Sequence, residues 1–134
     1  MLRFIAPSFT LLLALPLAAH AASLKEVELS KNLQKIAQES SVGTPRAINE
    51  DILDQGFTVE GNQLINHLSV RESQAEEMRR DPKTVYLQLG ASVCRNKGFR
   101  RLMAQGAVMR YDFTEYKTNR AIATQSYTAA DCGK

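Results

Sequence analysis

The feature that most constrains this chain is its one pair of cysteines, Cys94 and Cys132. They enclose about 38 residues, and a bond between them would be worth roughly 3–4 kcal/mol in the chain-entropy model of cross-linking. That is a large share of the stability of a small domain. We therefore expect the fold to be organised around residues 81–132, with the preceding chain packed against them.

The first 21 residues indicate that the chain is exported. An apolar run over residues 9–18 follows a basic residue, and Ala-His-Ala at residues 19–21 has the A-x-A form of a cleavage site. The run is short and contains Pro16, so a retained membrane helix is the weaker interpretation. We predict a secretory signal peptide over residues 1–21, cleaved near Ala21, a periplasmic or secreted location, and one α+β domain over residues 22–134.

Export decides the state of the cysteines. In an oxidising compartment two cysteines pair by default, so we predict a disulfide between Cys94 and Cys132. A redox-active pair is disfavoured, because such pairs usually have only two residues between the cysteines. The residue directly after the predicted cleavage site is not a cysteine, so no lipid anchor is expected. We also expect no membrane span in the mature chain.

The first half of the mature chain contains one helical pattern and two strand patterns. Apolar residues recur at helical spacing over residues 24–40, and Ser23 and Glu26 have the S-x-x-E spacing of a capping box. We therefore predict an amphipathic helix over residues 24–40. The next apolar patterns, over residues 52–59 and 62–70, predict two strands joined by a tight turn.

Three helical segments are predicted before the next strand. Residues 71–80 are charged and helix-prone, so they predict a solvated helix or connector. Asp81 is placed to cap a helix over residues 82–94, whose wide apolar stripe predicts that it is largely buried. Gly90 in its middle indicates a close backbone approach, because glycine there costs about 1 kcal/mol relative to alanine. A short helix over residues 99–106 follows.

The C-terminal part predicts a strand hairpin and a returning tail. Residues 107–114 alternate between apolar and polar, and residues 120–128 return as a second strand. We expect the tail to bring Cys132 back onto the helix that carries Cys94. The predicted fold is α+β of order α-β-β-α-α-β-β, an α/β/α sandwich with helices on a three- to four-stranded antiparallel sheet and one disulfide.

The residues give little support for catalysis or for a cofactor. A hydrolase triad needs a nucleophile, a base and an orienting group, yet His67 is the one histidine of the mature chain and lies in a predicted strand. We expect a half-buried structural role for it. No metal-type spacing and no glycine-rich phosphate loop occurs, so no metal and no cofactor is predicted. The 17 basic and 14 acidic residues are too balanced for a nucleic-acid binder.

One cluster of charge could contact a partner. Four cations gather within seven positions: Arg95, Lys97, Arg100 and Arg101. They flank the start of a predicted helix, whose first amides are unpaired, so they could bind an anionic group of a protein. The alternative is that Arg95 and Lys97 offset the dipole at the end of the preceding helix while the other two are solvated. The structural interpretation, in which the cations only offset the dipole or are solvated, is the simpler one. Both interpretations stay open.

Several short motifs resemble one protein family. They are Cys94-Arg95-Asn96 with Phe99-Arg100, Gly106-Ala107 before Tyr111-Asp112-Phe113, Cys132, Thr44-Pro45-Arg46 and Gly61-Asn62-Gln63-Leu64-Ile65. Over about residues 24–132 the chain resembles the putative quorum-sensing-regulated virulence factor family of small exported gammaproteobacterial proteins. The resemblance implies a compact α/β/α sandwich around a small antiparallel sheet, with no established catalytic residues.

These features lead to one expected function and one alternative. We expect an exported, non-enzymatic binding or accessory protein, with virulence and quorum-sensing regulation implied by the resemblance. Its partner would be a protein of unknown identity, acidic if it contacts the basic cluster. The alternative is an inhibitor of a secreted or cell-wall hydrolase, because small disulfide-bonded exported domains often take that role. A catalytic function ranks third.

Overall fold

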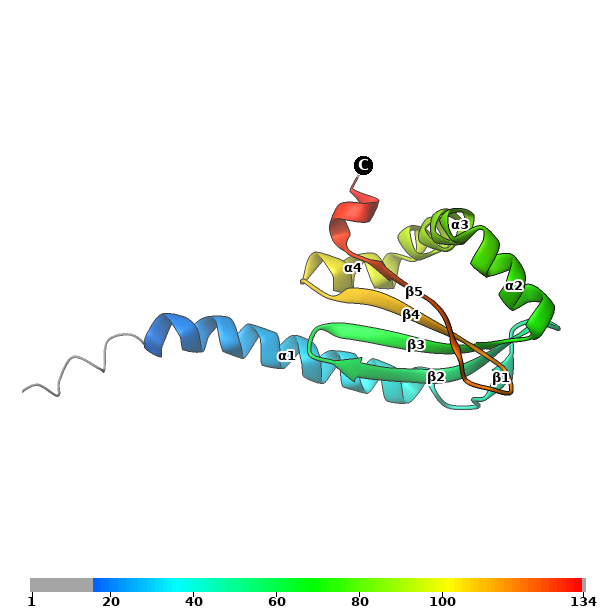
Figure 1. The fold of residues 1–134 in the computed structure, drawn as a ribbon. Helices are drawn as coiled ribbons and strands as arrows, with labels where there is room; N and C mark the ends of the chain where they lie inside the picture. The colour runs from blue at the N-terminus through cyan, green and yellow to red at the C-terminus, as the bar shows by residue number, and fades with distance from the viewer. Residues whose placement is uncertain (1–15, 134) are drawn as a thin grey trace, which may run out of the picture.

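The computed structural model describes the backbone of residues 16–133 and the side chains of residues 24–133. Within these residues one five-stranded sheet is combined with four α-helices and a terminal 3-10 turn (Figure 1). The predicted signal peptide over residues 1–21 lies largely outside the described residues. No helix of the described part is long and apolar enough to cross a membrane.

The elements follow in chain order as α1 (Pro16–Ser40), β1 (Arg46–Ala47), β2 (Ile52–Glu60), β3 (Gln63–Val70), α2 (Glu72–Arg80), α3 (Pro82–Arg95), α4 (Lys97–Ala104), β4 (Val108–Glu115), β5 (Ala121–Tyr127) and η2 (Ala129–Cys132). The long helices and strands lie close to their predicted positions. The two-residue strand β1 and the 3-10 turn η2 were not predicted, because neither is long enough to show a period.

The sheet is mixed, with the strand order β1-β2-β3-β4-β5. β2 and β3 form the predicted hairpin, with Gly61 at φ 60° in the turn, and β4 and β5 form the second hairpin. β3 and β4 run parallel, with Gln63 opposite Val108 and Val70 opposite Glu115. The predicted antiparallel sheet of three to four strands is therefore wrong at this pairing. Parallel neighbours need a long crossover, and α2, α3 and α4 provide it.

The described helices cover one face of the sheet. Leu33 of α1 and Met103 of α4 belong to the same buried cluster as Leu68 and Met109, which project from one face of β3 and β4. The opposite face carries mostly polar side chains and no described helix packs on it, although Ile65 of β3 is only 1% exposed there. The predicted α/β/α sandwich is wrong for the described residues, since a sheet of this size buries its apolar face fully against one helical layer.

The start of α1 also differs from the prediction. The helix begins at Pro16 rather than near Leu24, so Ser23 lies inside it and is not its N-cap. The Ala-rich segment before Ser23 favours helix, which explains why the helix continues upstream of the predicted capping box. The helix ends at Ser40, as predicted.

α3 is less buried than its apolar stripe predicts. Val93 is its one fully buried residue, whereas Tyr86 and Leu89 are half-buried. The reason is its position over β5, an edge strand that covers one side of the helix. The predicted start of α3 is confirmed, because the Asp81 carboxylate accepts the Thr84 amide at 3.2 Å.

Gly90 is a point of close approach between α3 and β5. Tyr127 is 1% exposed, and a Cβ built on Gly90 would lie 2.8 Å from Cε1 of the Tyr127 ring. The ring stacks on Tyr86 with centroids 4.9 Å apart, and its hydroxyl donates to the Tyr86 carbonyl at 2.8 Å. Burial raises the pKa of the Tyr127 hydroxyl, so it stays protonated as a donor. The predicted close approach at Gly90 is confirmed.

We predict that Gly90→Ala destabilises the protein although alanine favours helix. Overpacking against a rigid buried ring costs about 1–3 kcal/mol and the helical gain is about 1 kcal/mol, so the free energy of unfolding should fall by up to about 2 kcal/mol. Urea unfolding measures the change, with Ser92→Ala on the exposed side of α3 as the control. A Gly90→Ala variant more stable than the wild type would contradict the close packing.

Candidate functional site

A disulfide fixes the corner where α3, α4 and η2 meet. Cys94 near the end of α3 is bonded to Cys132 at the end of η2, with their Cα atoms 5.4 Å apart. A capping turn holds η2 in place, because Asp131 accepts the Thr128 amide at 2.7 Å and the Tyr86 hydroxyl at 3.1 Å. The tail therefore folds back onto α3, and the corner has little freedom to move.

The basic cluster lies at this corner. Asn96 joins α3 to α4 and caps α4, since its side-chain oxygen accepts the Phe99 amide at 3.0 Å. The Arg100 guanidinium turns back and donates to the Cys94 carbonyl at 3.2 Å, where it offsets the carbonyl end of α3. The Phe99 amide and the Arg100 guanidinium therefore already have hydrogen-bond partners within the chain. The remaining cations are exposed and form no ion pair in the described part: Arg95, Lys97 and Arg101.

A shallow hollow of about 330 Å³ lies beside the cluster, between α1 and α4. Ile36, Phe99 and Leu102 give it an apolar lining, and Arg101 lies at its side. Apolar surface next to arginine is a combination enriched where proteins bind proteins. The corner and this hollow together form the candidate partner-binding surface, which we call the α3–α4 corner.

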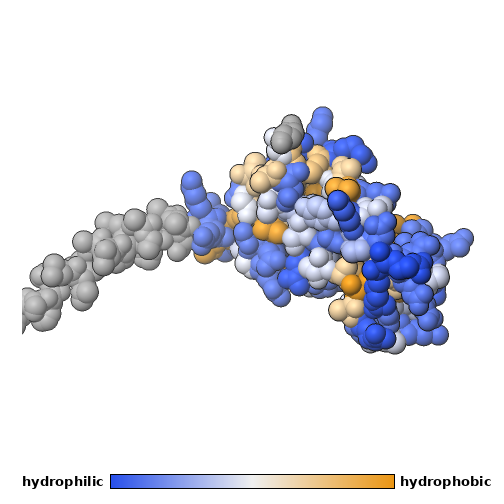
Figure 2. All heavy atoms as spheres, turned by 45° about the horizontal axis from the view of Figure 1, so that its top comes forward, coloured by the Kyte–Doolittle hydropathy of each residue, from blue (hydrophilic) through white to orange (hydrophobic). Residues whose placement is uncertain are grey.

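Apolar side chains are also exposed elsewhere among the described residues. The exposed large apolar side chains are spread over several elements: Leu24, Val27, Val42, Ile48, Leu87 and Tyr116. On the face shown in Figure 2, apolar atoms form small patches within a mostly hydrophilic surface. Scattered apolar residues of this kind are normal on soluble proteins and do not mark a site.

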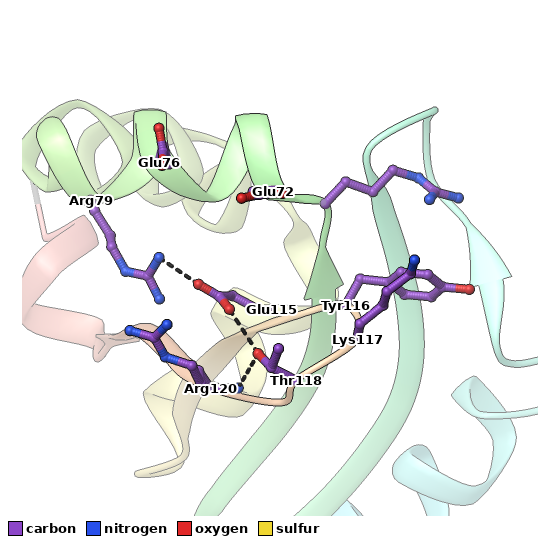
Figure 3. Close-up of a pocket in the computed structure, with 9 residues that line it drawn as sticks. Glu72, Glu76, Arg79, Glu115, Tyr116, Lys117, Thr118 and Arg120 are labelled. Atoms are coloured by element: carbon purple, nitrogen blue, oxygen red, sulfur yellow. Dashed lines mark hydrogen bonds and ion pairs between the residues drawn. The ribbon is translucent and has the colours of Figure 1, made fainter.

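A second hollow, of about 610 Å³, lies between α2 and the turn that joins β4 to β5 (Figure 3). Arg79 reaches down from α2, and its Nη1 lies 2.6 Å from Oε2 of Glu115. The Thr118 hydroxyl donates to the other oxygen of Glu115 at 2.7 Å. The Thr118 hydrogen bond and the Arg79 guanidinium hold the pKa of the Glu115 carboxyl below its ordinary value. This network fastens α2 to the hairpin.

Several side chains that line the same hollow are engaged in contacts within the protein. Arg71 lies over the Tyr116 ring, 4.8 Å from its centroid, and donates to the Glu50 carbonyl at 2.9 Å. Its lining contains both basic and acidic side chains, so it favours no single class of ligand. The sequence analysis missed this network, because Arg79 and Glu115 are distant in sequence and neither stands in a recognisable motif.

His67 lies on the open face of the sheet and is half-buried, as predicted. Its Nε2 lies 2.7 Å from the Thr58 hydroxyl oxygen. Asp112 is the residue opposite His67 on β4, but it accepts two hydrogen bonds from Arg110, at 2.8 and 3.0 Å, rather than from the imidazole. Among the described residues no group of side chains could hold a metal ion.

We predict that Cys94→Ser lowers the free energy of unfolding by about 2–5 kcal/mol, because the bond restricts the unfolded chain. Urea unfolding measures the loss. Reducing agent should destabilise the wild type by a similar amount and leave the variant unchanged. Two reactive thiols in the unreduced, denatured protein would contradict the disulfide.

A second prediction concerns Glu115. Because its pKa is lower in the folded protein, its contribution to stability is present above the ordinary pKa near 4.5 and is lost as the pH falls through the folded value. Glu115→Gln should therefore be less stable than the wild type at neutral pH, with the difference shrinking in acid. Glu76→Gln, on the same hollow but without an ion pair in the described part, is the control. A difference that grows in acid would contradict the assignment.

Comparison with known proteins places the chain in one family and one fold. A sequence profile described as putative quorum-sensing-regulated virulence factor matches residues 22–133. A putative secreted protein from Pseudomonas aeruginosa, solved as a crystal structure, is 67% identical, with 81% of this chain and 96% of that chain covered and a TM-score of 0.80. No curated protein sequence matches this chain.

Two solved pilotins share the fold at low identity. The type 2 secretion system pilotin EpsS from Vibrio vulnificus is 16% identical, with 82% of this chain and 96% of that chain covered and a TM-score of 0.63. The type II secretion system pilotin AspS from Vibrio cholerae is 20% identical, with 84% and 99% covered and a TM-score of 0.65. On the family profile and the close Pseudomonas relative, this chain belongs to the putative quorum-sensing-regulated virulence factor family.

Proposed function

We propose that this protein is an exported, non-enzymatic accessory protein that acts by binding another protein. The observation that carries the proposal is the fold shared with two type II secretion pilotins, over 82% and 84% of this chain. Pilotins are components of a secretion system, so the likeness supports an accessory role in the cell envelope. The identity is too low to carry over the partner itself.

Export is the second part of the proposal. The A-x-A site at residues 19–21 and the disulfide between Cys94 and Cys132 agree with cleavage near Ala21 and with an oxidising compartment. The Pseudomonas relative is described as secreted, which supports the same location. Virulence and quorum sensing in the family description concern context and regulation, and they leave the partner open.

The α3–α4 corner is the surface that we assign to the partner. Its disulfide and the Asn96 cap hold the backbone in place, so a partner would not have to order it on binding. Lys97 and Arg101 project from one short helix beside an apolar hollow. A partner with acidic side chains around an apolar anchor fits this surface, and opposite charge would speed its approach.

Capture of the partner tests the proposal most directly. Mature protein lacking residues 1–21 is used as bait in periplasmic and secreted fractions, and the captured proteins are identified by mass spectrometry. We expect a component of the envelope or of a secretion apparatus. Specific capture of a hydrolase whose activity falls on binding would support the inhibitor alternative and overturn the accessory role.

Charge reversal tests the surface. Arg100 should be left intact because it bonds the Cys94 carbonyl, so the informative variant is Lys97→Glu with Arg101→Glu. It should slow association with the captured partner by about tenfold at low salt, and should weaken the dependence on ionic strength. Arg80→Glu with Lys83→Glu, at exposed positions near the opposite end of α3, makes the same charge change away from the corner. If both variants behave alike, the corner is not the interface.

A further inference from the structure

Two amide side chains at the α3–α4 corner form no hydrogen bond within the described residues. They are Asn32 of α1 and Gln105 at the end of α4, and both are exposed at the hollow of about 330 Å³ between these helices, which we call the α1–α4 groove. The neighbouring amide side chains are already bonded, since Asn62 donates to the Gly106 carbonyl at 2.9 Å and Asn96 caps α4. Asn32 and Gln105 are therefore available to a ligand.

The two amides lie at the same end of the groove. A Cβ built on Gly106 would lie 3.9 Å from Cδ2 of Leu29, so the turn of α1 between Leu29 and Asn32 lies beside the end of α4. Apolar side chains from both helices form the floor next to it: Ile36, Phe99 and Leu102. The groove therefore offers two unpaired amides beside an apolar floor.

The amides favour a ligand with free backbone groups. Each amide side chain presents donors and an acceptor, so a group that carries both a donor and an acceptor satisfies it best. An extended peptide presents N–H and C=O groups at every residue, whereas those inside a helix are paired with one another. α4 has eight residues and is about 12 Å long, so about four extended residues span it.

The cations beside the floor narrow the choice of segment. Arg101 lies at the side of the groove, and Lys97 is one turn before it on α4. Both are exposed and form no ion pair in the described part. A carboxylate complements them, and arginine can hold it with two parallel hydrogen bonds. An acidic residue next to a bulky apolar residue therefore fits the groove.

We infer that the α1–α4 groove binds a short extended segment of the partner. A bulky apolar side chain of the segment packs on the floor, an acidic neighbour meets Arg101, and the backbone bonds Asn32 and Gln105. The inference rests on the proposed function, because it specifies what the partner presents to the α3–α4 corner. It adds that a few consecutive residues carry the recognition, so a free peptide is enough for binding.

Selection of short random peptides on phage tests the inference, with the exported protein immobilised. The enriched sequences should share a bulky apolar residue next to an acidic one. A synthetic peptide of the enriched sequence, labelled with a fluorophore, should bind in solution between about 1 µM and 1 mM. If no peptide binds by about 1 mM, or if the enriched sequences lack an acidic residue, the inference is wrong.

Backbone recognition is tested with Asn32→Ala combined with Gln105→Ala. The double variant should bind the peptide about tenfold more weakly, the effect of losing one or two hydrogen bonds. Gln34→Ala with Gln38→Ala removes two exposed amides from another part of α1, beside β2, and should leave the affinity unchanged. Equal affinities in both double variants would contradict the role of the amides.

N-methylation of the peptide removes backbone donors and completes the test. It should weaken binding to the wild type but have little further effect on the Asn32→Ala, Gln105→Ala protein, because the bond is already lost there. The captured partner separates the two proposals. If it responds to Lys97→Glu with Arg101→Glu but not to loss of the two amides, the corner stands and the extended segment is wrong. If it responds to neither, the corner itself is not the interface.

Discussion

The packing of Tyr127 against α3 is the interaction on which the C-terminal half depends. The buried ring fits against Gly90 and its hydroxyl donates to the Tyr86 carbonyl, so the Tyr127 side chain packs directly on the backbone of α3. This contact places the end of β5 under α3 and brings the following turn within reach of Cys94. The Cα atoms of Cys94 and Cys132 lie 5.4 Å apart, within the range that a disulfide spans.

The parallel pairing of β3 with β4 sets the overall arrangement. Three helices connect these two strands, and they pack on the face of the sheet that α1 also covers. The opposite face is left polar, with His67, Arg110 and Asp112 bonded to neighbours on the sheet rather than arranged around a substrate. These side chains therefore fasten neighbouring strands together.

The α3–α4 corner combines a constrained backbone with exposed cations beside an apolar hollow. The Cys94–Cys132 disulfide, the Asn96 cap and the hydrogen bond from Arg100 to the Cys94 carbonyl constrain it. The cations and the apolar lining come largely from one short helix, α4.

Local features were determined by the sequence alone. The N-cap at Asp81, the turn at Gly61 and the close approach at Gly90 depend on neighbouring residues or on one residue's conformational freedom, and each is found where it was predicted. Family membership followed from short motifs in the same way. Oxidation of Cys94 and Cys132 was inferred from the compartment, which in turn was inferred from the predicted signal peptide.

Only the tertiary structure decided which strands are neighbours and which faces are covered. Alternation in β4 shows that one face is buried, but it cannot show that β3 lies beside it in parallel or that every described helix shares that face. The order of the strands and the face that the helices cover also decide three finer features. These are the half-exposure of α3, the Arg79–Glu115 ion pair and the hydrogen bond from Arg100 to the Cys94 carbonyl. Periodicity reports the environment of a residue, whereas its partners are selected by packing between segments distant in the chain.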